Sequence, residues 1–384
     1  MQARVDLMRR SLAILQAGQA PNGAFVASPT FPVYHYSWFR DGTFIAQALD
    51  EWGKHEPARR FYEWGMKIVL ANADDARAAL AGAAGEPPRR YLHTRYALDG
   101  ARGDEDWPNF QLDGFGTFLW GLVDHLDRTA GPAPANWQAA VGLLTKYLRH
   151  LWRCPNFDCW EEFPDKVHVS TLSALYGGLQ AVGRRFQDED AAETAQEIRA
   201  VVLGHSAGGH LPKFIGSDVV DASLLWACIP FGMIEADDPL MVETAGMVER
   251  DLVGPDGGVH RYADDSYYGG GAWPLLTALL GEYFLLRGDA VRALSVLVWI
   301  ERQASPSGDL PEQVPQDLNH PEMYEPWVER WGPIACPLLW SHAAYLHLKH
   351  AIGSVEGSTS TVDDESRPAD SAEAAMRFSP RIDR

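Results

Sequence analysis

Residues 41–73 read DGTFIAQALDEWGKHEPARRFYEWGMKIVLANA and contain two segments with different hydrophobic patterns. The first, at 41–53, is the more apolar and is rich in small residues, which is typical of a buried helix. The second, at 56–73, has apolar residues at helical spacing and a charged face, which is typical of a helix with one side in water. The stretch therefore predicts a buried helix followed by a half-exposed one.

The same alternation continues along the chain. Six segments are of the first kind: 41–53, 113–126, 168–185, 220–233, 272–287 and 336–350. Six segments are of the second kind: 3–17, 56–73, 134–152, 190–204, 239–252 and 289–303. This alternation predicts an all-α fold, a closed double ring of six inner and six outer helices called an (α/α)6 barrel.

The lengths of the connections support the same fold. Links from a buried segment to the next half-exposed one are short, about two to eight residues, as expected for antiparallel neighbours. Links in the other direction are long, and the longest, 74–112, has roughly 40 residues. In an alternating ring all the long loops open on one face, and long loops in compact domains tend to be functional. We therefore expect the active site on that face.

One domain accounts for nearly the whole chain. Residues 1–352 are expected to form a single barrel domain that carries the active site. Residues 353–384 are polar and rich in Ser, Asp and Glu, which predicts a disordered C-terminal tail.

Composition excludes several classes of partner. The formal net charge of −19 argues against nucleic acid and anionic membranes, since both require concentrated Lys and Arg. No apolar run approaches the roughly 18 residues of a membrane span, and the first residues lack the apolar stretch of a signal peptide. These features predict a cytoplasmic protein. Its four cysteines, which lack paired C-x-x-C spacing, are interpreted as reduced structural thiols: Cys154, Cys159, Cys228 and Cys336.

The sequence GHSAG at 204–208 matches the G-x-S-x-G elbow of serine hydrolases. That elbow requires a strand that leads into a helix, whereas 190–204 has a helical pattern. A helix starting at Ser206 would meet Gly208, Gly209 and Pro212 within two turns, which disfavours it. We therefore interpret Ser206 as a loop residue and keep a serine esterase as a minor alternative.

The long loops are rich in carboxylates and aromatic residues. Cleavage of a glycosidic bond needs one carboxyl that protonates the leaving oxygen and one carboxylate on the other face of the sugar. Aromatic rings can stack on the sugar, and Arg and Asp pairs can hold its hydroxyl groups. The candidates, in chain order, are Trp38, Arg40, Asp41, Trp107, Gln111, Asp113, Trp160, Glu161, Glu162, Arg261, Tyr262, Asp264, Asp265, Trp273, Glu312 and Gln313.

Each candidate also has a structural interpretation. Glu161 and Glu162 could be a solvated acidic pair, and Glu312 could be an exposed turn residue. Arg40 and Asp41 could form an ion pair at a helix N-terminus. The order in which the motifs occur decides between these interpretations.

The loops and buried segments carry a series of motifs in a fixed order. They are W-x-R-D at the first buried segment, Q-x-D-G at the second, W-E-E before the third, R-Y-x-D-D-x-Y-Y-x-G-G-x-W-P before the fifth and L-P-E-Q before the sixth. This ordered series, over roughly residues 30–350, resembles glycoside hydrolase family 15, the glucoamylase-like enzymes. The resemblance implies an (α/α)6 barrel that removes glucose from the non-reducing end of α-glucosides with inversion at the anomeric carbon.

The resemblance also implies roles for individual residues. Glu161 matches the general acid, and Glu312 matches the general base that activates water. Arg40 and Asp41 match a pair that holds hydroxyls of the terminal glucose, and Glu162 and Gln313 are expected further from the reacting atoms. Residues that match the lining of the first sugar sites are Trp38, Trp107, Arg261, Tyr262, Trp273 and Trp340. Trp160, Gln111 and Asp113 complete the expected substrate-binding set, and the chemistry needs no metal or organic cofactor.

The expected substrate is a small α-glucoside, with isomaltose and isomalto-oligosaccharides ahead of maltose. This preference follows from the resemblance to short family members that lack additional domains. Trehalase or maltose-directed glucoamylase activity on the same scaffold is the nearest alternative. A non-catalytic sugar-binding barrel is an alternative of another class, and loss of either Glu161 or Glu312 would be its signature. The sequence leaves the oligomeric state open.

Overall fold

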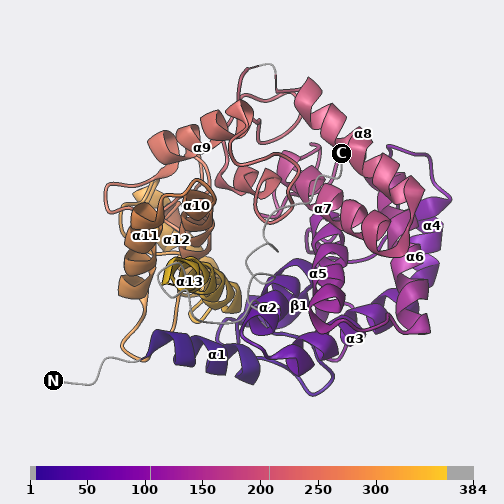
Figure 1. The fold of residues 1–384 in the computed structure, drawn as a ribbon, viewed down its shortest axis with the longest axis horizontal. Helices are drawn as coiled ribbons and strands as arrows, with labels where there is room; N and C mark the ends of the chain where they lie inside the picture. Colours follow the sequence, from indigo (N-terminus) through magenta and orange to yellow (C-terminus); the bar gives the residue numbers. More distant parts are fainter. Residues whose placement is uncertain (1–5, 104, 207, 361–384) are drawn as a thin grey trace.

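The computed structural model describes residues 6–103, 105–206 and 208–360. Its inner ring contains α2 (Phe39–Glu51), α5 (Asp113–Thr129), α7 (Val169–Phe186), the 3-10 helix η2 (Ala222–Ala227), α10 (Pro274–Leu286) and α13 (Leu339–Ser360). Each of these elements packs against the next, and α13 packs against α2, so the ring is closed (Figure 1).

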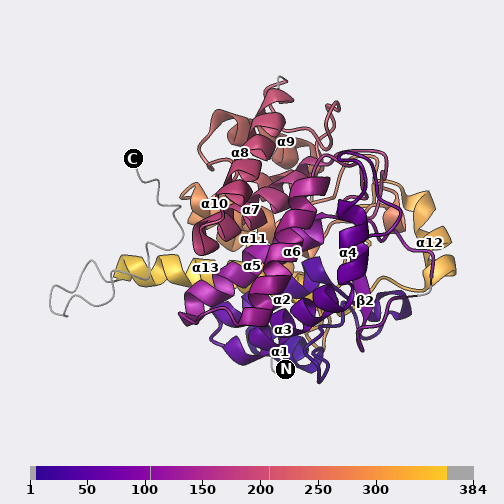
Figure 2. The same ribbon diagram turned by 90° about the vertical axis from the view of Figure 1, so that its right-hand side faces the viewer.

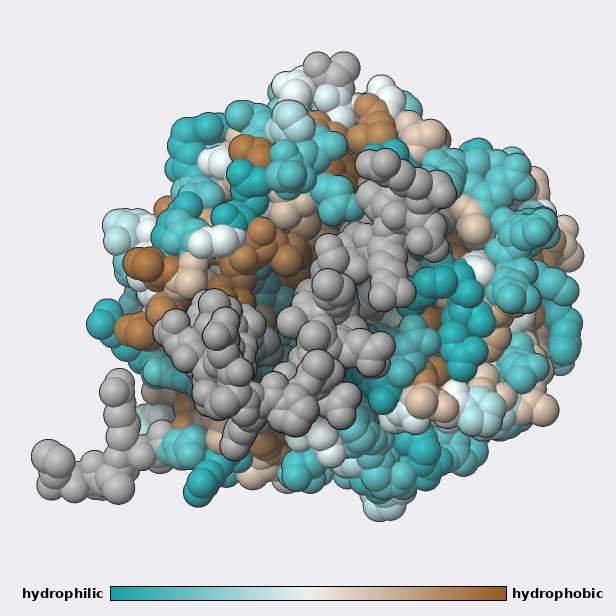
Figure 3. All heavy atoms as spheres, viewed as in Figure 1, coloured by the Kyte–Doolittle hydropathy of each residue, from teal (hydrophilic) through white to brown (hydrophobic). Residues whose placement is uncertain are grey.

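The outer layer contains α1 (Leu7–Ala17), α3 (His55–Ala71), α6 (Ala135–Leu151), α8 (Glu189–Gly204), α9 (Pro239–Leu252) and α11 (Ala290–Gln303). Figure 1 shows these helices around the outside of the ring. On the face drawn in Figure 3, hydrophilic residues dominate the periphery, as expected from the charged faces of the outer helices. The predicted (α/α)6 architecture is confirmed.

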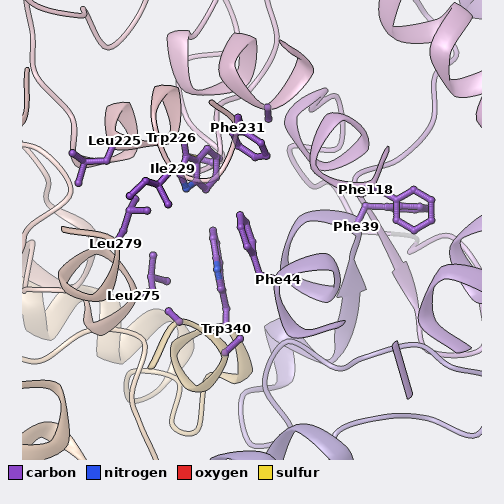
Figure 4. Packing of buried hydrophobic residues seen from close by; sticks show 14 of the residues in the cluster. Phe39, Phe44, Phe118, Leu225, Trp226, Ile229, Phe231, Leu275, Leu279 and Trp340 are labelled. Carbon is purple, nitrogen blue, oxygen red and sulfur yellow. The ribbon is translucent and has the colours of Figure 1, made fainter. Parts of the chain in front are cut away.

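The fourth inner element differs from the prediction. The segment 220–233 was expected to be an α-helix, but it contains only the six-residue 3-10 helix η2 and then turns. Pro230 explains why no α-helix continues to 233, because proline has no N–H to donate and its ring would clash with the carbonyl four residues earlier, at Trp226. The side chains of Trp226, Ile229 and Phe231 instead fill the interior of the barrel (Figure 4).

Small residues allow the inner helices to pack closely. A Cβ atom built on Gly116 of α5 would lie 2.6 Å from the carbonyl of Ala174 on α7, and one on Gly178 would meet the carbonyl oxygen of Gly116. Large aromatic residues fill the space inside the ring. Phe44 of α2 stacks on Trp340 of α13, with ring centroids 5.3 Å apart and an interplanar angle of 10° (Figure 4). The barrel is therefore a packed core rather than an open channel.

The long loops contain secondary structure that the hydrophobic pattern did not predict. Loop 74–112 contains most of α4 (Ala73–Leu80) and all of β2 (Arg95–Ala97), and loop 304–335 contains α12 (Tyr324–Trp331). Strand β2 pairs antiparallel with β1 (Tyr36–Trp38) from loop 18–40. In Figure 2, β2 and α12 lie at one end of the barrel, and the C-terminal end of α13 projects from the other. The functional loops therefore gather on one face.

The C-terminal boundary also differs from the prediction. Helix α13 continues to Ser360, whereas the tail was expected to begin at residue 353. A helix already nucleated by buried turns can add residues individually, which allows this polar extension. The remaining part of the predicted tail, 361–384, lies outside the described residues.

The state of the cysteines and the lengths of the helices can be stated for all the residues that the structure describes, 6–103, 105–206 and 208–360. The four cysteines are all free thiols, and three of them are buried. Within these ranges no helix is both long and apolar enough to cross a membrane.

Candidate active site

The turn from β1 into α2 positions the first group of predicted residues. Because α2 begins at Phe39, Arg40 and Asp41 lie in its first turn with both side chains buried. The guanidinium of Arg40 lies 3.2 Å from Asp41 and 3.1 Å from Asp113 at the start of α5. Burial raises the pKa of Asp41 to about 6, although the charge of Arg40 opposes that rise. The structure thus brings together the arginine and carboxylates that were expected to hold sugar hydroxyls.

Gln111 connects this group to Glu161. Its side-chain oxygen accepts a hydrogen bond from Arg40 at 3.0 Å, and its amide donates to Glu161 Oε1 at 3.0 Å. The indole N–H of Trp38 donates to the same oxygen of Glu161 at 2.8 Å. Two loops distant in sequence therefore fix the orientation of this carboxyl, and both contacts use one of its oxygens.

The second predicted catalytic residue, Glu312, is almost completely buried, with 3% of its surface exposed. The hydroxyl of Tyr34 donates to Glu312 Oε1 at 2.9 Å, and Tyr34 is hydrogen-bonded to the hydroxyl of Tyr267 at 2.7 Å. Oε2 is buried and has no hydrogen-bond partner among the described residues. Burial raises the pKa of Glu312 to about 8, against the opposing effects of the Tyr34 hydrogen bond and the charge of Arg261.

Aromatic side chains bridge the two carboxyls. The ring of Tyr34, which contacts Glu312, lies edge-on to the ring of Trp38, which contacts Glu161, with centroids 5.7 Å apart. The hydrophobic pattern did not identify Tyr34 or Tyr267 as functional residues. Tyr267 belongs to the R-Y-x-D-D-x-Y-Y motif but was assigned no role, and Tyr34 lies four residues before Trp38 of the W-x-R-D motif.

A third group contains the residues on either side of Glu161 in the chain, Trp160 and Glu162. Glu162 accepts a hydrogen bond from the hydroxyl of Tyr262 at 2.6 Å and lies 3.3 Å from the guanidinium of Arg261. Arg261 also pairs with the buried carboxylate of Asp265. Trp160 and Trp273 pack against each other beside Arg261, with ring centroids 5.5 Å apart. The residues from W-E-E and R-Y-x-D-D thus form one connected wall.

The remaining candidates have mainly structural contacts. Gln313 accepts a hydrogen bond from the backbone N–H of Gly271 and donates to the carbonyl of Tyr267, so it holds the Gly269–Gly271 turn in place. Trp340 stacks in the barrel core, with the guanidinium of Arg40 5.3 Å from its ring.

Trp107 has contacts that the motifs did not predict. It lies between the guanidinium of Arg95, 3.7 Å from its ring, and the ring of Trp331 on α12, 6.0 Å away.

Ser206 lacks the surroundings of a catalytic serine. Helix α8, rather than a strand, leads into it, and its buried hydroxyl donates to the carbonyl of Val202 at 2.8 Å. The esterase interpretation is therefore wrong. Among the described residues, no group of three or more His, Cys, Asp or Glu side chains could hold a metal ion.

The raised pKa of Glu312 makes stability depend on pH. Between about 4.5, the ordinary value, and about 8, the folded protein holds a proton that the unfolded chain releases. The stabilisation from this proton is fully present below the ordinary pKa and is lost as the pH rises toward 8. In this range the free energy of unfolding of the wild-type protein should fall by up to ~1.4 kcal/mol for each unit of pH increase. We expect Glu312→Gln to abolish this contribution.

Urea unfolding of both proteins at pH 5, 6, 7 and 8 measures that difference in slope. The exposed Glu322 of the same loop offers a matched control, because its replacement by glutamine should leave the wild-type slope unchanged. Parallel curves for wild type and Glu312→Gln would show that the carboxyl is not held protonated in the fold.

An (α/α)6 barrel with two differently held carboxyls among aromatic and arginine side chains on its loop face defines a glycoside hydrolase. The family model described as glycosyl hydrolases family 15 matches residues 2–288, and the chain belongs to that family.

Comparison with individual proteins gives the same result. The chain is 42% identical over 361 residues to an isomaltose glucohydrolase from Kribbella flavida, covering 91% of this chain and 93% of the relative. It superimposes on the solved structure of a wild-type glycosidase with a TM-score of 0.85 at 39% identity, covering 91% of this chain and 96% of the other. A bacterial glucoamylase complexed with acarbose shares the fold, with a TM-score of 0.71 at 21% identity over 90% of this chain and 55% of the other.

Proposed function

We propose that this enzyme is an inverting, exo-acting α-glucoside hydrolase that releases β-glucose from the non-reducing end of short α-glucosides, isomaltose above all. The observation that carries the proposal is the pair of carboxyls, Glu161 and Glu312, each held by its own set of donors. The identity to an isomaltose glucohydrolase, which covers more than nine tenths of both chains, supports the choice of substrate.

Glu161 is assigned the role of general acid. Its Oε1 accepts two hydrogen bonds, from Trp38 and Gln111, so a proton on this carboxyl belongs on Oε2. From there it can pass to the glycosidic oxygen as the bond to the anomeric carbon breaks. A positioned acid of this kind contributes about 10²–10⁴-fold to the rate.

Glu312, in its deprotonated form, is assigned the role of general base. Because burial raises its pKa to about 8, the fraction in this form increases as the pH rises toward 8. Tyr34 holds Oε1, which leaves the buried Oε2 to accept a hydrogen bond from the attacking water. This water would attack the anomeric carbon from the face opposite the leaving group, so the released glucose has the β configuration. The mechanism requires a separation of about 6.5–9.5 Å between the two carboxyl groups.

Arg40, Asp41 and Asp113 support the exo mode of action. Their buried, paired charges lie at the N-terminal ends of inner helices and can bind the hydroxyls of one terminal glucose. A site that ends in such a group accepts the end of a chain rather than its middle.

Trehalose and maltose hydrolysis would use the same two carboxyls and differ only in contacts to the second sugar. A non-catalytic sugar-binding barrel would have no need for two carboxyls with distinct hydrogen-bond partners. The geometry therefore favours an enzyme over a non-catalytic sugar-binding barrel.

Time-resolved proton NMR of the purified protein with isomaltose, maltose and trehalose tests the proposal. We expect isomaltose to disappear fastest and β-glucose to appear before its α anomer. Initial α-glucose would contradict the inverting mechanism, and faster loss of trehalose or maltose would contradict the linkage assignment. Absence of glucose from all three would favour the sugar-binding barrel.

A further inference from the structure

A buried lysine lies behind the loop that carries Glu161. Lys213 is 4% exposed in its side chain, and its ammonium group lies 2.7 Å from Asp221 and 3.6 Å from Asp158. The side chains of the two aspartates are 1% and 2% exposed, respectively. Burial of an ammonium group and two carboxylates is costly unless they compensate one another. The mechanism proposed above assigns no role to this cluster.

Asp158 holds the loop that contains Glu161. One of its oxygens, Oδ1, accepts hydrogen bonds from the backbone N–H groups of Trp160 and Glu162, at 3.0 and 2.9 Å. Its carbonyl accepts a hydrogen bond from the N–H of Glu161, also at 2.9 Å. Glu161, between the two captured N–H groups, has a φ of 69°. This left-handed conformation is unfavourable for a residue with a side chain and persists only where its surroundings enforce it.

Asp221 holds the residue next to Glu161 in the chain. Its two carboxylate oxygens accept the indole N–H of Trp160 at 3.1 and 3.0 Å. Asp221 is itself fixed by the backbone N–H and hydroxyl of Ser223 at the start of η2. The acid loop is therefore anchored at two points, and both anchors are carboxylates.

Lys213 is the cation that lies between these anchors. Burial alone would lower its pKa, but the carboxylates of Asp221 and Asp158 raise that pKa overall, so the lysine stays charged. Its ammonium group also lies 3.5 Å from the ring of Tyr262, whose hydroxyl donates to Glu162. One charge thus contacts the supports on both sides of Glu161.

We propose that Lys213 is a positioning residue for the general acid. By compensating Asp158 and Asp221 it keeps both carboxylates buried in the orientation that captures the N–H groups beside Glu161. This holds the Glu161 backbone at its positive φ and its carboxyl against Trp38 and Gln111. The inference rests on the proposed role of Glu161 as the acid.

Two substrates separate positioning of the acid from general loss of structure. Isomaltose needs a proton on its leaving oxygen, whereas fluoride leaves α-D-glucopyranosyl fluoride with little need for an acid. We expect Lys213→Met to lower kcat on isomaltose about 100-fold, within the range of general acid catalysis, and on the fluoride less than about 10-fold. Lys213→Arg, which retains the charge, should restore most of the isomaltose activity. KM should change little in both variants.

Glu161→Gln serves as the reference, because direct loss of the acid should produce the same selectivity with a larger effect. If Glu161→Gln lowers both activities equally, the proposed acid is wrong. If Glu161→Gln lowers mainly the activity on isomaltose, two results overturn the positioning role of Lys213. In one, Lys213→Met lowers both activities equally, and in the other it lowers neither.

A second variant keeps the test decisive if Lys213→Met does not fold. Asp158→Asn retains an oxygen that can accept the N–H groups of Trp160 and Glu162, but it removes the charge that faces Lys213. We expect a selective loss on isomaltose, smaller than that of Glu161→Gln. Full activity on isomaltose, or equal losses on both substrates, would overturn the proposal.

Discussion

Replacement of Glu161 by glutamine is expected to lower kcat for isomaltose by about 10³-fold, with little change in KM. Glutamine keeps the size of the side chain and can still accept the hydrogen bond from Trp38, but it cannot give a proton to the leaving oxygen. Steady-state release of glucose from isomaltose measures the loss. Hydrolysis of α-D-glucopyranosyl fluoride by the same variant should fall far less.

Glu282 on α10 provides a matched control for this variant. It is a carboxyl outside the candidate site, and burial raises its pKa to about 7. Glu282→Gln should therefore reproduce the effect of replacing a half-buried glutamate by glutamine without touching the reaction. A similar fall in kcat for both variants would show that the loss at Glu161 arises from the fold and not from the chemistry.

Replacement of Glu312 by glutamine is expected to lower kcat by about 10²–10⁴-fold on isomaltose and on the fluoride alike. Both substrates need an activated water, and an amide does not remove a proton from it. The absence of selectivity is the distinguishing result, because loss of the acid affects mainly the substrate with the poorer leaving group. Parallel kinetics with the two substrates measure it.

The stability of Glu312→Gln separates chemistry from folding in that experiment. The amide replaces a carboxyl that the fold keeps protonated below about pH 8, so the variant should unfold at the same or a higher urea concentration at pH 7. An inactive variant that is also less stable would leave no support for a base at this position. Retention of activity on the fluoride would assign the base to another residue.

The motifs identified most of the side chains that meet in the candidate site. The start of α2 places Arg40 and Asp41, and the loop just before α5 places Gln111. These positions depend on residues that are close together in the sequence. Glu161 and Glu312 were predicted as the catalytic pair because they lie within the family-like motifs W-E-E and L-P-E-Q. Gln313 was expected further from the reacting atoms, and its amide binds backbone groups of a neighbouring loop.

Other features depend on contacts that no local pattern describes. Tyr34 bonds to Glu312 across 278 positions of the chain, and Trp38 bonds to Glu161 across 123. The α-helix predicted at 220–233 does not form over that length, because an α-helix cannot continue through Pro230 and apolar spacing carries no information on this break. Strand β2 was missed because three residues are too few to show a periodicity.

Hydrophobic periodicity is a property of consecutive residues, so the alternation of buried and half-exposed helices, and hence the barrel, is specified locally along the chain. The sequence of the long loops likewise specifies which carboxylates, arginines and aromatic side chains lie on the loop face. How those groups are held depends on the folded chain: two donors bind Glu161 Oε1, a tyrosine binds Glu312, and the buried Lys213 lies between Asp158 and Asp221. The physical reason is that hydrogen bonds and ion pairs act over a few ångströms in space, and the loops that supply the partners meet only when the ring of helices closes.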